Sequence, residues 1–117
     1  MPWSLRGVLL ATAVATALGA PVAARADDTA EPSHARQQAL IRLLKQDCGA
    51  CHGMRLTGGL GPALTREALK DKSAESLAAT IVSGRTGTAM PPWRPFLTEA
   101  EAQWLVARLQ RGETYAP

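Results

Sequence analysis

The fold of this chain is constrained most by one short segment, Asp47–Gly53, with the sequence DCGACHG. It holds both cysteines of a chain of 117 residues, a length that allows one small domain and excludes a two-domain enzyme. A domain of this size buries only a thin core and often needs a disulfide, a metal or a cofactor to be stable. The chemistry of the two cysteines therefore decides how the sequence is interpreted.

The pattern Cys-x-x-Cys-His is typical of covalent attachment of haem c. Two thiols three residues apart, Cys48 and Cys51, can each form a thioether with one vinyl group of the haem. His52 follows directly and presents an imidazole to the iron, while Gly49 and Ala50 keep the intervening backbone small. Since the pattern occurs once, the sequence predicts one haem c, attached through Cys48 and Cys51 with His52 as an axial ligand.

Three other sites are compatible with these cysteines. A thioredoxin-like redox pair would need a βαβ context, which the sequence lacks. A structural disulfide between Cys48 and Cys51 would suit an exported protein. A zinc site would need four ligands, and His52 and His34 could complete the set only with an unusual spacing. We favour haem attachment over these alternatives.

The second axial ligand is predicted to be Met90, which follows His52 by 38 residues and can therefore reach the other face of a haem. Pro91 directly after it restricts the backbone and stiffens the loop. Met54 is only two residues past His52, too near to round the haem edge. His34 as the ligand, or Met90 as a packing residue only, remain alternatives.

The N-terminal segment 1–26 has the features of a secretory signal peptide. Arg6 precedes an uncharged stretch of small and apolar residues, Val8–Leu18, and Ala24–Ala26 supplies an A-x-A cleavage pattern. A retained membrane anchor is the alternative, but the apolar stretch is shorter than the roughly 20 residues that span a bilayer. We therefore expect export to the periplasm, where bacterial c-type haem is attached, and no stable membrane insertion.

The predicted cleavage leaves 91 residues with eleven Lys and Arg against ten Asp and Glu, a formal charge of +1. This balance does not point to a nucleic-acid partner. We expect residues 27–32 to form a mobile polar leader and residues 33–117 to form one monohaem domain.

Helix signals cover the rest of the chain, and no stretch has the alternation of a strand. The final helix has the clearest boundaries, because Thr98 and Glu101 form a capping box and Gly112 is a typical end. We expect helices over about 34–47, after an N-cap at Ser33; over 66–70, after Thr65; from Ser73 to Gly84; and from Thr98 to Gly112. The predicted class is all-α, with three to five helices.

The chain resembles class I c-type cytochromes in its N-terminal helix, its Cys-x-x-Cys-His motif, its Gly61-Pro62 segment, and a late Met90 before a final helix. The resemblance implies a small cytochrome c fold wrapped around one covalently bound haem, and an electron-transfer protein rather than an enzyme. It also implies that the carbonyl of Pro62 accepts a hydrogen bond from the ligand histidine. The chain departs from the family at Leu40 and Leu44, where a small residue and an aromatic are common.

A narrower resemblance rests on Gly87–Thr98, in which Met-Pro-Pro-Trp is followed by the start of a helix. This segment is similar to the cytochrome c55X (NirC) family, and we expect Trp93 to line the haem pocket. The resemblance implies a periplasmic carrier of single electrons in denitrification, with cytochrome cd1 nitrite reductase as partner. A role with a d1 haem assembly protein is the alternative, and a ligand-binding haem sensor with an open sixth position is a third. Arg85 and Arg94 are candidates for a docking patch.

Overall fold

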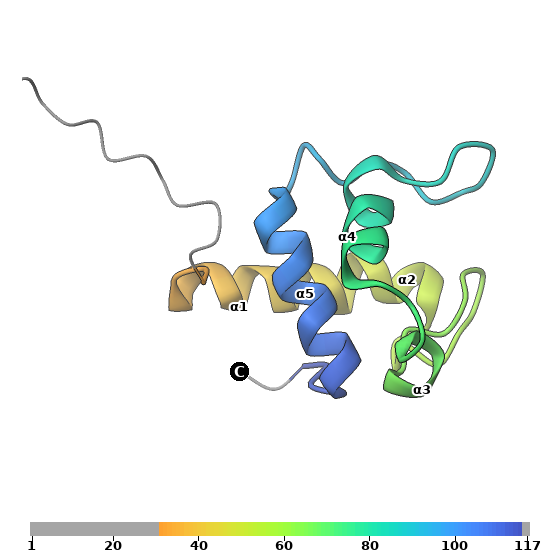
Figure 1. Cartoon of the computed structure of the whole chain (residues 1–117), viewed down its shortest axis with the longest axis horizontal. Coiled ribbons are helices and arrows are strands. Elements are labelled where there is room, and N and C mark those ends of the chain that lie inside the picture. The colour runs from red at the N-terminus through yellow and green to blue at the C-terminus, as the bar shows by residue number, and fades with distance from the viewer. Residues whose placement is uncertain (1–30, 116–117) are drawn as a thin grey trace, which may run out of the picture.

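The computed structural model describes residues 31–115, and within this range all regular structure is helical (Figure 1). The predicted signal peptide, 1–26, and most of the predicted leader lie outside the described residues. Among the helices that are described, none is both long and apolar enough to span a membrane. The all-α prediction is confirmed.

The N-terminal helical segment runs without a break through the cysteine motif. It consists of α1 (His34–Leu43), a π-helical turn η1 (Leu44–Cys48) and α2 (Gly49–His52). The prediction placed the end of this helix at residue 47, before the cysteines. Both cysteines instead have helical backbone, and the helix ends only at Gly53, which takes a φ of +88°.

Three further helices follow, and their starts agree with the capping signals. They are α3 (Arg66–Leu69), α4 (Ala74–Ser83) and α5 (Glu99–Arg111). The side chains of Thr65, Ser73 and Thr98 each accept a hydrogen bond from a backbone N–H of the first helical turn. Both hydrogen bonds of the predicted capping box are present at the start of α5, and Gly112 ends that helix in the left-handed conformation.

The core lies where α5 packs against α4 and α3 and crosses the N-terminal helical segment (Figure 1). Leu40 and Leu44 are almost completely buried. These are the two positions at which class I c-type cytochromes often have a small residue and an aromatic. Trp104 is only half-buried, and its ring lies 4.9 Å from the guanidinium of Arg108. The other buried apolar residues are Ile41, Leu56, Leu69, Ala78, Val82, Leu97, Ala102, Leu105, Val106 and Leu109.

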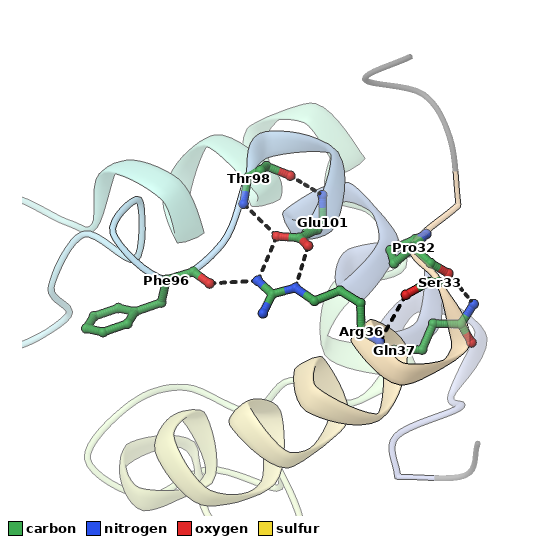
Figure 2. Close-up of polar contacts among 7 residues, drawn as sticks. All are labelled: Pro32, Ser33, Arg36, Gln37, Phe96, Thr98 and Glu101. Carbon is green, nitrogen blue, oxygen red and sulfur yellow. Dashed lines mark hydrogen bonds and ion pairs between the residues drawn. The ribbon is translucent and has the colours of Figure 1, made fainter. Parts of the chain in front are cut away.

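A polar contact joins the first turns of α1 and α5 (Figure 2). The guanidinium of Arg36 binds both carboxylate oxygens of Glu101, with Nη2 at 2.9 Å from Oε2. The same Nη2 donates to the carbonyl of Phe96 at 2.8 Å. Because Glu101 also accepts a hydrogen bond from the backbone of Thr98, one arginine fixes the start of α5 and the end of the segment before it.

Candidate functional site

His52 lies at the end of α2, and its imidazole is held in one orientation. Its Nδ1 donates to the carbonyl oxygen of Pro62 over 2.7 Å, since a carbonyl can only accept. This assigns the proton to Nδ1 and leaves the lone pair on Nε2 for a metal. His52 is 9% exposed, and a Cβ added to Gly61 would lie 2.8 Å from Nδ1 and Cε1 of the ring. The backbone at Gly61 therefore lies directly against the imidazole.

The loop after α2 brings Pro62 next to His52, because its backbone N–H groups bind carbonyls at the end of the helix. The N–H of Gly58 donates to the carbonyl of His52 at 2.9 Å, and that of Gly61 donates to Cys51 at 2.8 Å. These bonds satisfy carbonyls that a helix end leaves without partners. The loop can approach the end of the helix this closely only because residue 53 is glycine, since a Cβ on Gly53 would lie 2.6 Å from the carbonyl oxygen of Gly58.

Cys48 and Cys51 lie on the same helical segment and are not joined by a disulfide. Cys51 is exposed, whereas Cys48 is half-buried, and burial together with the nearby Asp47 raises the pKa of the Cys48 thiol to about 11. Disulfide exchange enzymes instead lower a cysteine pKa, so the thioredoxin-like alternative is disfavoured. Within residues 31–115 no cluster of three or more His, Cys, Asp or Glu side chains is placed to hold a metal ion.

Met90 lies in the loop between α4 and α5, which turns back on the end of α4. Its carbonyl accepts the N–H of Arg85 at 3.1 Å, and the N–H of Trp93 donates to Ile81 at 3.1 Å. A Cβ on Gly84 would come within 2.6 Å of the carbonyl carbon of Pro91. The chain before and after Met90 is therefore anchored to the last turn of α4.

One cavity of about 870 Å³ collects the predicted site residues. Its lining includes all six of them: Cys48, Cys51, His52, Pro62, Met90 and Trp93. Neither of the alternative ligands is among the lining residues: Met54 is exposed, and His34 lies at the start of α1. An imidazole nitrogen, a thioether sulfur and two thiols around a largely apolar cavity are the donor set that a covalently bound haem requires, so the site fits that group.

Polar residues on α4 also line the cavity, and sequence reasoning missed them. Ser73 is the N-cap of α4, and Ser76 and Thr80 follow it within the helix at intervals of three and four residues, which places them on one side of the helix. Thr88 and the cationic Lys72 and Arg85 are missed lining residues as well. The spacing on α4 gives its polar residues a common helical face, but a polar face of this kind can meet either solvent or a ligand, so the sequence alone does not assign it to the cavity.

Comparison with known proteins identifies this arrangement. A family model described as "Cytochrome C oxidase, cbb3-type, subunit III" matches residues 35–107. Cytochrome c55X of Pseudomonas aeruginosa is 54% identical over 101 residues, which cover 86% of this chain and 83% of that protein. A solved structure of "c-type cytochrome NirC" is 58% identical with a TM-score of 0.70, and the match covers 73% of this chain and all of that one.

A larger protein shares part of this fold. The dihydro-heme d1 dehydrogenase of Pseudomonas aeruginosa is 36% identical over 75 residues, which cover 64% of this chain but only 15% of that protein. The match to that dehydrogenase is thus to a domain, while the matches to cytochrome c55X cover most of both proteins. The chain therefore belongs to the cytochrome c55X family of c-type cytochromes, which are electron carriers rather than enzymes.

Proposed function

We propose that this protein is exported to the periplasm and carries single electrons through one haem c. In this proposal Cys48 and Cys51 form the thioether bonds, and His52 and Met90 are the axial ligands of the iron. The bound group supplies a one-electron couple at the iron. The segment 1–26 is removed as a signal peptide, and residues 33–117 form the monohaem domain.

One observation carries the proposal: the two cysteines, His52 and Met90 all line the same cavity. The hydrogen bond from His52 to Pro62 supports the assignment of the first axial ligand, because it presents Nε2 in the correct tautomer. The anchored loop supports the second, because a thioether is a weak ligand that must be held in place. Methionine opposite histidine raises the potential relative to two histidines.

The chain's own side chains suit electron transfer rather than catalysis. Leucine, isoleucine and valine side chains from α3, α4 and α5 form much of the lining. An apolar lining of this kind would keep water away from a bound haem. Cys51 is exposed, so the cavity is open to the surface at the point where a thioether would form. An electron can therefore pass at this edge to a partner that docks transiently, which requires only a small interface.

The proposed partner is cytochrome cd1 nitrite reductase, the partner implied by the resemblance of Gly87–Thr98. A second candidate is a d1 haem assembly protein, and one observation favours it: part of the dihydro-heme d1 dehydrogenase is 36% identical to this chain. The rates of electron exchange with the mature reductase and with the assembly protein, measured side by side, separate the two. The faster exchange identifies the partner.

Replacing the two methionines in turn tests the ligand assignment. Met90→Ala should open the sixth position, so the reduced protein should bind carbon monoxide rapidly and its reduction potential should fall. Met54→Ala is the matched control, because Met54 lies outside the cavity lining, and it should bind carbon monoxide as slowly as the unaltered protein. Stopped-flow absorbance with carbon monoxide measures both.

The same experiment tests the sensor alternative. Rapid binding of carbon monoxide by the unaltered protein, unchanged by Met90→Ala, would show that the sixth position is open. That result would contradict Met90 as a ligand and favour a ligand-binding haem protein.

A further inference from the structure

The loop that carries Met90 receives little support from packing. Every residue from 85 to 89 is exposed, and Met90 itself is only partly buried. Within the described residues the side chain of Thr86 makes no hydrogen bond, and a Cβ on Gly87 would meet nothing within 4 Å. The position of Met90 in this loop therefore depends on hydrogen bonds.

Thr88 makes most of the hydrogen bonds inside this loop. Its hydroxyl donates to the carbonyl of Arg85 at 2.8 Å and accepts the backbone N–H of Met90 at 3.3 Å. Its own N–H donates to the same carbonyl of Arg85 at 3.0 Å. Within the described residues, no other side chain makes a hydrogen bond to the backbone of residues 84–90. The hydroxyl thus joins the first residue of the loop to the residue proposed as the ligand.

The hydrogen bonds of Thr88 constrain a different part of the loop from the contacts at its two ends. The bond from Arg85 to Met90 and the close approach of Gly84 to Pro91 close the base of the loop. They set where the loop begins and ends, and they involve the carbonyl side of Met90. Only the hydroxyl of Thr88 holds the N–H side, and a residue fixed on both sides has fewer orientations for its side chain.

We propose that Thr88 is the positioning residue for Met90: its hydroxyl holds the backbone so that the thioether sulfur stays directed into the cavity. The inference rests on the proposed function, since it takes Met90 as the axial ligand. Thr88 does not touch the iron in this account. It acts through Met90, by lowering the fraction of time in which the loop releases the sulfur.

The test uses the oxidised holoprotein and added imidazole, which can occupy the sixth position only when Met90 leaves it. The apparent affinity for imidazole therefore reports the released fraction. Thr88→Val removes the hydroxyl, Thr88→Ser keeps it, and Thr86→Val is the matched control two residues away. The red absorbance band of a sulfur-ligated oxidised haem is recorded for each variant, together with its thermal unfolding.

A hydrogen bond of ordinary strength predicts that Thr88→Val binds imidazole roughly two- to tenfold more tightly than the unaltered protein. The Thr88→Ser and Thr86→Val variants should remain within about twofold of it. The sulfur band should weaken in Thr88→Val at raised temperature before the protein unfolds, and serine should restore it. This rescue separates positioning from a general loss of stability.

Two results would overturn the proposal, and they can be told apart. If Thr88→Val matches Thr86→Val in affinity for imidazole while both show the sulfur band, Thr88 does not position Met90, and the proposed function stands. If the unaltered protein has no sulfur band, Met90 is not the ligand, and the assignment falls together with the role of Thr88.

Discussion

The imidazole of His52 shows how closely single residues control this site. Pro62 accepts its Nδ1 hydrogen at 2.7 Å, and the backbone of Gly61 lies against the ring where no Cβ fits. Proline and glycine thus have separate roles in two adjacent positions. One sets the tautomer and the direction of the ring, and the other leaves the space that the ring occupies.

Replacing Gly61 with alanine should move the histidine ring. The added Cβ would lie 2.8 Å from Nδ1 and Cε1, so the ring or the loop must shift. We expect a loss of about 1–3 kcal/mol in the free energy of unfolding of the holoprotein, together with a changed reduction potential. Denaturant unfolding followed by haem absorbance measures the first, and a redox titration measures the second.

Gly49→Ala is the control for this prediction, because its Cβ would meet Met54 Sδ at 3.4 Å, an ordinary contact, within a helix. Gly49→Ala should leave the free energy of unfolding nearly unchanged. Equal effects of the two substitutions would show that the ring of His52 is not specially constrained by Gly61.

Single site residues can be predicted from the sequence where the chemistry requires a fixed spacing between them. The cysteines and His52 are predicted from one motif, and they line the same cavity as Met90. Thr88 could not be predicted, because its partners are backbone atoms of Arg85 and Met90, and only the folded loop brings them to its hydroxyl.

At the scale of the elements, helix starts could be predicted and helix continuation could not. A cap such as Thr98 with Glu101 is a local interaction, so the sequence contains all of its parts. The helix continues through a π-helical turn at Leu44–Cys48, and its end is bound by N–H groups of Gly58 and Gly61, a contact that only the folded loop makes. The helix was therefore predicted to end too early.

The pairing of Arg36 with Glu101 gives the contact between α1 and α5 a pH dependence. The hydrogen bond from Arg36 lowers the pKa of the Glu101 carboxyl. A lowered pKa in the folded state means that the contribution to stability is complete above the pKa of the unfolded chain. It is lost as the pH falls through the folded value.

Glu101→Gln should therefore cost stability at neutral pH, and the cost should shrink as the pH falls below about 4. A double-mutant cycle with Arg36→Gln should give a coupling of about 0.5–1 kcal/mol at neutral pH, since the arginine side chain is 39% exposed and solvent screens the pair. Urea unfolding at several pH values measures both quantities.

Glu99→Gln, in the same first turn of α5, is the control. It should cost less at neutral pH, because Glu99 is exposed and the ion pair with Arg36 of α1 is made by Glu101. A cost for Glu101→Gln that stays constant between neutral and acid pH would contradict the ionised pair.

At the scale of the whole molecule, the described chain places its site residues around one cavity, which adjoins the core that α5 forms with α4 and α3. The N-terminal helical segment brings both cysteines and the histidine, and the loop between α4 and α5 brings the methionine. The class of fold and the family follow from the sequence, because the cofactor motif and the capping signals agree. The polar wall on α4 was missed, because the sequence does not show which face of that helix meets the cavity.

The most direct test of this account is the intact mass of the purified, exported protein, recorded together with its absorbance spectrum. The account predicts the mass of residues 27–117 plus one haem that denaturation does not release, and an oxidised spectrum with the band of sulfur ligation. A colourless protein with the mass of the processed polypeptide alone would contradict it.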